Sequence, residues 1–81
     1  MKYYAIHDKK AEKYFVPVVF ENDAVAVRWF TSVINGEEII IKDYPEDYTL
    51  EMIGKFDERT GIFTPDLKLI MSGTTVSRKE Q

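Results

Sequence analysis

An alternating segment followed by a five-residue loop constrains the fold of this chain more than any other feature. In YTLEMIGKF, from Tyr48 to Phe56, apolar and polar side chains alternate over most of the length, as in a strand with one buried face. The next residues, DERTG, begin with Asp57 and end with Gly61. Aspartate favours the start of a turn, and glycine tolerates the positive φ that closes a bulged hairpin loop. The sequence therefore predicts a β-hairpin that returns through residues 62–64.

A second segment, NDAVAVRWFTSVIN at residues 22–35, has the spacing of an amphipathic helix. Asn22 or Asp23 can cap it, because a short side-chain oxygen accepts from the free amides of the first turn. Gly36 follows, and glycine in the left-handed conformation commonly ends a helix. Apolar side chains recur every three to four residues along one stripe, namely Ala26, Val27, Phe30, Val33 and Ile34. We expect this stripe to pack on a sheet.

Shorter patterns assign the other segments. Residues 3–7 are rich in strand-forming residues and predict a strand. Residues 15–22 contain Pro17, which cannot donate to a ladder, so they predict an edge strand or an extended connector. The three isoleucines at 39–41 fit either a short strand or an apolar anchor in a linker, because the run is too short for periodicity to decide. After Pro65, DLKLIM allows a short strand, and the small polar residues beyond it are typical of a frayed tail.

Together these segments predict an α+β fold, with one helix packed on a small antiparallel sheet of three to four strands and with a C-terminal β-hairpin. The chain has 81 residues, of which 44% are hydrophobic, and this suits one small folded domain. We place that single α+β domain at residues 1–66. Residues 67–81 are expected to form a short extension and a flexible tail.

Composition narrows the class of protein. The chain has no cysteine, which excludes disulfides and favours a reducing cytoplasm. It also lacks an apolar run long enough to span a bilayer, so we expect no membrane association. The net charge is −3, with mildly basic ends and a strongly acidic middle. Such a distribution disfavours strong binding to duplex DNA by the folded body, because phosphate neutralisation drives that affinity.

The acidic residues around Pro45 do not form a convincing metal site. The candidates are Asp43, Glu46, Asp47 and Glu51, and they are interrupted by proline and aromatic residues where a calcium loop needs flexibility. With His7 as the only histidine, zinc or iron would depend almost entirely on carboxylates. His7 also lacks a nucleophile motif with which to act as a general base. We therefore expect no catalytic residues, no metal and no cofactor, and interpret the acids as a capped turn that enters a strand.

Aromatic residues alternate with lysines near the N-terminus, in KYYAIHDKKAEKYF. Proteins that bind single strands combine a basic groove with aromatic rings on which bases stack. The alternative is that half of these rings are core and that the lysines form a solvated edge that deters aggregation. The nucleic-acid hypothesis assigns phosphate contacts to Lys9, Lys10, Lys13 and Arg28, and stacking to Tyr4, Tyr14 or Trp29.

Three segments, in this order, resemble the small non-structural protein of gokushovirus-type microviruses, which are bacteriophages with circular single-stranded DNA genomes. They are KYYAIHDKKAEKYFVP, NDAVAVRWF and YPEDYTLEMIGKFDERTGIF, and they cover about residues 1–64. The most specific part is the pattern at residues 45–61. The resemblance implies an early protein of the host bacterial cytoplasm that is absent from the virion. It also implies a role in viral DNA synthesis, in the switch toward single-stranded genomes, and provides no catalytic residue.

Two functions follow as hypotheses. In the first, a non-enzymatic protein binds single-stranded DNA or the viral replication complex. In the second, a protein–protein adaptor or modulator of a host protein acts through its acidic surface. Exposed strand edges and the uneven charge also predict a homodimer, formed by sheet extension or by helix packing.

Overall fold

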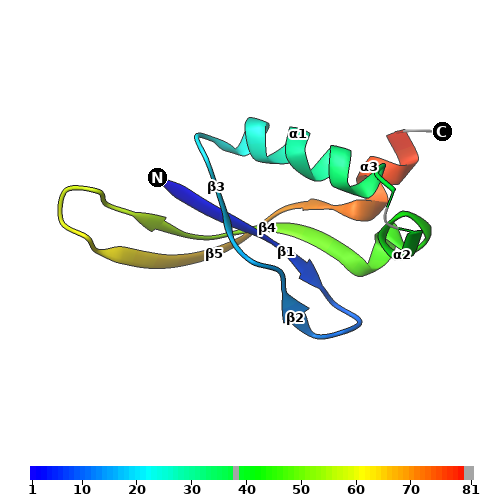
Figure 1. Cartoon of the computed structure of the whole chain (residues 1–81), viewed down its shortest axis with the longest axis horizontal. Helices are drawn as coiled ribbons and strands as arrows, with labels where there is room; N and C mark the ends of the chain where they lie inside the picture. The colour runs from blue at the N-terminus through cyan, green and yellow to red at the C-terminus, as the bar shows by residue number, and fades with distance from the viewer. Residues whose placement is uncertain (38, 80–81) are drawn as a thin grey trace.

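A computed structural model describes residues 1–37 and 39–79, and within them the chain has the predicted α+β fold (Figure 1). The strands are β1 (Lys2–Asp8), β2 (Lys13–Tyr14), β3 (Val18–Phe20), β4 (Tyr48–Phe56) and β5 (Phe63–Ser72). The helices are α1 (Asp23–Ile34), α2 (Ile39–Asp43), the 3-10 helix η1 (Pro45–Asp47) and α3 (Gly73–Lys79). The sheet therefore has five strands, slightly more than predicted, because β2 and β3 are short strands that pair with β1.

The sheet is antiparallel, with the order β2-β1-β4-β5 and with β3 also paired to β1. Helix α1 lies across one face of it (Figure 1). Pairing of Tyr4 with Met52 and of Ile6 with Leu50 places these four side chains on that face. They form the core together with Ala26, Phe30 and Ile34 of α1. Each large side chain that is fully buried contributes about 1.5–3 kcal/mol, so this interface provides much of the stability.

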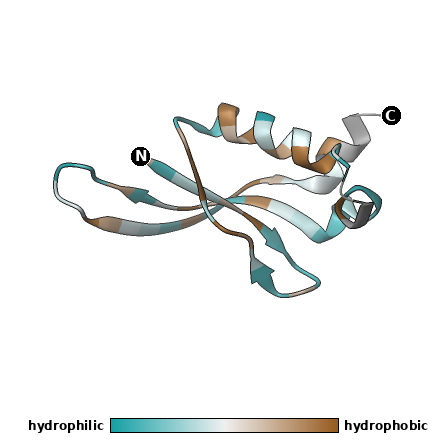
Figure 2. Ribbon diagram, viewed as in Figure 1, coloured by the Kyte–Doolittle hydropathy of each residue, from teal (hydrophilic) through white to brown (hydrophobic). Residues whose placement is uncertain are grey.

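Helix α1 begins as predicted and ends differently. The side-chain oxygen of Asn22 accepts a hydrogen bond from the Val25 amide at 3.0 Å, and hydrophobic and hydrophilic residues mix along the helix (Figure 2). Gly36 does not adopt the predicted left-handed conformation, since among the described glycines only Gly61 has a positive φ. A Cβ atom at Gly36 would lie 3.1 Å from the Ser32 carbonyl oxygen. The backbone therefore approaches itself closely here, and a side chain at this position would require a small local shift.

The predicted hairpin is confirmed. Gly61 has a φ of 76°, and its amide donates to the Asp57 carbonyl oxygen at 2.8 Å. The Asp57 amide donates to the Ile62 carbonyl oxygen at 2.9 Å, and the Asp57 carboxylate accepts from the Arg59 amide at 2.9 Å. Aspartate and glycine thus close the loop in the two positions that the sequence predicted.

The structure corrects the prediction for residues 67–81. Strand β5 runs without interruption to Ser72, and α3 follows it. Val76 in α3 is only 2% exposed and belongs to the core. A Cβ atom at Gly73 would collide with the Pro45 carbonyl oxygen, so α3 begins in close contact with η1. Residues 67–79 are therefore part of the fold rather than an extension, and residues 80–81 of the predicted tail lie outside the described residues.

The isoleucine run at 39–41 is not a strand, because it opens the short helix α2. Ile41 is 8% exposed and belongs to the core, which agrees with the alternative of an apolar anchor in the linker. Pro65 lies inside β5, which is the last strand in the sheet order. A proline is tolerated on an edge strand because a missing amide donor there need not break the ladder.

The molecule is elongated. Its principal extents are 43, 24 and 19 Å, and its radius of gyration is 13.0 Å. A compact chain of this length has a radius of gyration of about 12 Å. The difference arises from the β4–β5 hairpin, which projects beyond the end of α1 (Figure 1).

The buried hydroxyl of Tyr4 makes the free energy of unfolding depend on pH. Its ring is fully buried, and its hydroxyl donates to the Asp23 carboxylate at 2.6 Å. Burial first, and then this hydrogen bond and the negative charge, raise the pKa of Tyr4 well above its ordinary value. The unfolded chain ionises this phenol above about pH 10, whereas the folded chain retains the proton. Tyr4 therefore contributes stability at neutral pH that is lost as the pH rises above about 10.

We expect Tyr4→Phe to flatten the fall in the free energy of unfolding at alkaline pH, measured by urea denaturation in a pH series. Tyr44→Phe is the matched control, because Tyr44 is 54% exposed. A Tyr4→Phe variant with the wild-type dependence on pH would contradict the role given to this hydroxyl.

Candidate nucleic-acid interface

An open groove brings three of the predicted binding residues together. Residues Lys13 to Val16, from β2 and the connector after it, line the groove together with Trp29 of α1. Its volume is about 530 Å³. Tyr14 is 42% exposed, and Trp29 is half-buried, with its ring 5.3 Å from that of Phe20. Lys13, Tyr14 and Trp29 thus place one cation and two aromatic rings around one hollow.

The groove continues into a second hollow of about 520 Å³. Phe15 and Trp29 line both hollows, and the ring of Phe15 lies edge-on to Tyr48 at 6.2 Å. The other lining residues of the second hollow are Ile6, Asp8, Val33, Ile41 and Tyr48. The combined surface is mostly apolar. Its two charged lining residues, Lys13 of the first hollow and Asp8 of the second, lie opposite each other in the pairing of β2 with β1. Apolar and aromatic walls of this kind suit flat rings better than strongly charged groups.

Tyr14 belongs to a polar cluster, which we define as His7, Tyr14, Thr49 and Glu51, and its partners in the cluster hold its ring in place. Its ring stacks on His7, with centroids 4.2 Å apart and an angle of 6° between the planes. Its hydroxyl donates to Glu51 Oε1 at 2.8 Å. That hydrogen bond, followed by partial burial and by the charge of Glu51, raises the pKa of Tyr14 above its ordinary value. Tyr14 is therefore neutral and oriented at neutral pH.

Glu51 is the centre of the polar cluster. Its Oε2 accepts a hydrogen bond from the Thr49 hydroxyl at 2.8 Å and lies 3.0 Å from His7 Nδ1. Both Thr49 and Glu51 are buried, at 6% and 9% exposure. Because a buried carboxylate is costly unless it is hydrogen-bonded, these three partners explain how Glu51 is accommodated.

Sequence reasoning missed the polar cluster, because it grouped Glu51 with the acids of a capped turn that enters a strand. The partners of Glu51 on β1 and β2 lie 44 and 37 positions away. The available signal was the Thr-x-Glu spacing, which puts Thr49 and Glu51 on one face of a strand. Only the register of β1 against β4 places His7 opposite Thr49.

The other predicted binding residues lie elsewhere. Tyr4 is 0% exposed in the core, so the prediction that it stacks on a base is wrong. Arg28 is exposed beside Trp29 on α1. Lys9 and Lys10 are exposed in the turn between β1 and β2.

The lysine turn has acidic surroundings. Lys10 lines a hollow together with Asp8 and Asp47, and the Lys9 amide donates to the Asp47 carbonyl oxygen at 2.8 Å. Asp8 also lines the second hollow of the groove. The turn therefore adjoins the groove, although nearby carboxylates reduce its attraction for phosphate.

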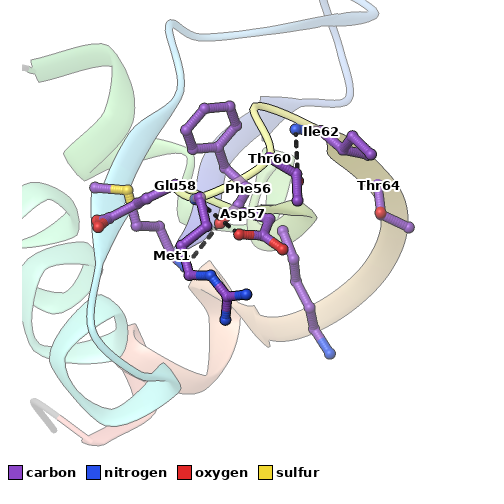
Figure 3. A pocket seen from close by; sticks show the side chains of 9 residues that line it. Met1, Phe56, Asp57, Glu58, Thr60, Ile62 and Thr64 are labelled. Atoms are coloured by element: carbon purple, nitrogen blue, oxygen red, sulfur yellow. Dashed lines mark hydrogen bonds between the residues drawn. The ribbon is translucent and has the colours of Figure 1, made fainter.

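A separate hollow of about 540 Å³ lies at the hairpin loop (Figure 3). Its polar groups serve the loop itself. The Met1 ammonium donates to the Phe56 carbonyl oxygen at 3.0 Å, and the Thr60 hydroxyl accepts from the Ile62 amide at 3.3 Å. None of the predicted binding residues line this hollow.

Two kinds of feature are absent from residues 1–37 and 39–79. In this part of the chain, no three histidine, aspartate or glutamate side chains lie together as potential metal ligands. The helices described there are too short or too polar to cross a membrane.

Nearly the whole chain is similar in sequence to known phage proteins. The family described as Phage ORF5 protein matches residues 1–76. Protein ORF5 of Chlamydia phage 1 is 40% identical over 70 residues, which cover 80% of this chain and 72% of that protein. No solved structure matches the chain. The similarity thus extends beyond residue 66, into the part that the structure places in β5 and α3.

Proposed function

The chain belongs to the Phage ORF5 protein family, and on this premise we propose that it is a non-enzymatic protein of viral DNA synthesis. It acts in the host bacterial cytoplasm and binds single-stranded DNA, alone or within the replication complex. In this role it aids the switch toward single-stranded genomes. The observation that carries the proposal is the groove in which Lys13, Tyr14 and Trp29 meet.

The groove has the parts that sequence-independent binding of a single strand needs. Such proteins combine cations for the backbone with aromatic rings for the bases, and each stacked base contributes about 1–3 kcal/mol. Tyr14 is already oriented by His7 and Glu51, so little conformational entropy is lost when a base stacks on it. Lys13 supplies a cation at the groove, whereas Arg28, next to Trp29 in the sequence, is exposed but does not line it.

The net charge of −3 limits the strength of binding. Phosphates are repelled by the acidic middle of the chain, so attraction depends on a few local cations. Binding should therefore be moderate and should weaken as salt rises, because the release of counterions into a concentrated salt solution gains less entropy.

Trp29 provides a direct test, because it is the only tryptophan in the chain. We expect its fluorescence to change when a single-stranded oligonucleotide is titrated at low salt. Lys13→Ala should weaken binding several-fold through the loss of one phosphate contact. Lys55→Ala is the matched control, because it removes the same charge from an exposed site on β4 that does not line the groove.

Two results would remove direct DNA contact from the proposal. One is the absence of any binding at low salt, where the electrostatic attraction is strongest. The other is equal weakening by Lys13→Ala and Lys55→Ala, which would show that only overall charge matters.

A second function is favoured by an exposed aromatic residue on the acidic surface. Tyr44 is 54% exposed between α2 and η1, and Asp43 and Glu46 beside it are also exposed. Exposed tyrosines are common anchors of protein interfaces. If the protein is an adaptor that acts through this surface, a pull-down from host lysate should recover a replication protein. Tyr44→Ala should abolish that recovery, and the protein should not bind oligonucleotides.

A further inference from the structure

The outer edge of β5 is unpaired in the described part of the chain. β5 is ten residues long and stands at the end of the sheet order. Leu67 and Leu69 are each 65% exposed on it, and Phe63 is 42% exposed. A long edge with exposed apolar side chains is a template for pairing with another strand.

We propose that β5 pairs with β5 of a second copy, antiparallel, about a two-fold axis at Leu67. In an antiparallel pair, the backbone N–H and C=O groups of two opposite residues either both point toward the partner strand or both point away from it. Along each strand, neighbouring residues alternate between these two orientations, so a residue cannot lie opposite the copy of its own neighbour. A symmetric pair must therefore place one residue opposite its own copy, and only a few registers are possible.

The charges of β5 select among these registers. With the axis at Leu67, Asp66 lies opposite Lys68 of the second copy, and symmetry produces this contact twice. An axis at Asp66 would place two carboxylates opposite each other, and an axis at Lys68 would place two ammonium groups opposite each other. Opposite charges across a strand pair stabilise it, whereas like charges destabilise it. The Leu67 register also brings the two Leu67 side chains together and sets Pro65 opposite Leu69.

Two features limit the strength of this pairing. Pro65 provides no amide donor, so each copy loses one possible hydrogen bond. The register of β4 and β5 shifts between Met52 and Gly54, with one more residue on β5 than on β4. This irregularity lies next to Leu67, where the two-fold axis would pass. The strands of both copies would therefore bend at the same point. We therefore expect a reversible dimer, which forms without DNA.

The test is sedimentation equilibrium of the full chain over a micromolar concentration series. The wild type should show a monomer–dimer equilibrium. Asp66→Lys and Lys68→Asp each put like charges opposite each other at two places, and each should raise the dimer Kd about tenfold or more. The double variant D66K/K68D restores opposite charges and should return the Kd to near the wild-type value.

Glu58→Lys is the control for charge, since it makes the same acid-to-lysine change at an exposed loop residue away from the paired segment. Circular dichroism verifies that each variant is folded. A wild type that stays monomeric at several hundred micromolar would overturn the proposal, as would a double variant that dimerises no better than the single ones. Either result leaves DNA binding in the groove unaffected, because the groove does not involve β5.

Discussion

Replacing Phe30 by alanine is expected to lower the free energy of unfolding by about 3–5 kcal/mol. Phe30 is 0% exposed, at the middle of the face of α1 that packs on the sheet. Domains of this size have little stability in reserve, so the variant should be largely unfolded at 37 °C. In a thermal melt followed by circular dichroism, Tm should fall by more than about 12 °C.

Arg28→Ala is the matched control for Phe30→Ala. It also truncates a long side chain on α1, but Arg28 is exposed. Its effect should remain within about 0.5 kcal/mol. If both variants melt at the wild-type temperature, α1 does not pack on the sheet as the structure describes.

Placing a charge at Val76 is the second change with a large expected effect. Val76 is 2% exposed and belongs to the core, so Val76→Asp would bury a carboxylate among apolar side chains. Such a charge costs several kcal/mol without a partner, and we expect the variant to be unfolded or to melt far below the wild type.

Thr75→Asp introduces the same charge one residue earlier in α3, at an exposed position. It should be nearly neutral, because an acid in the first turns of a helix is well tolerated. The pair of variants is compared by thermal melting and urea denaturation. Equal stability of the two would mean that α3 is not part of the core.

Local signals predicted the parts of the fold whose geometry is determined locally. Asp57 and Gly61 specify a loop by their own turn chemistry, and Asn22 specifies a helix start through one hydrogen bond. The segment after residue 66 gave no such signal. Its order depends on the insertion of Val76 into the core and on the contact of Gly73 with η1, and both are tertiary interactions.

The candidate site was predictable only where the residue type alone indicated a role. Lys13, Tyr14 and Trp29 were identified by residue type, and the fold brings them to one groove. Tyr4 was misassigned, because adjacent strand residues face opposite sides and the sequence does not reveal which side a helix covers. Tyr3, its neighbour, is the half-buried one and packs on Phe63 with ring centroids 5.5 Å apart.

The projecting hairpin has a consequence for hydrodynamic measurements. A particle with extents of 43, 24 and 19 Å experiences more friction than a sphere of the same mass and elutes early from a gel-filtration column. The monomer alone should therefore give an apparent mass above 9.5 kDa when calibrated against spherical standards. Mass determined at sedimentation equilibrium or by light scattering does not depend on shape, and it separates an elongated monomer from two associated copies.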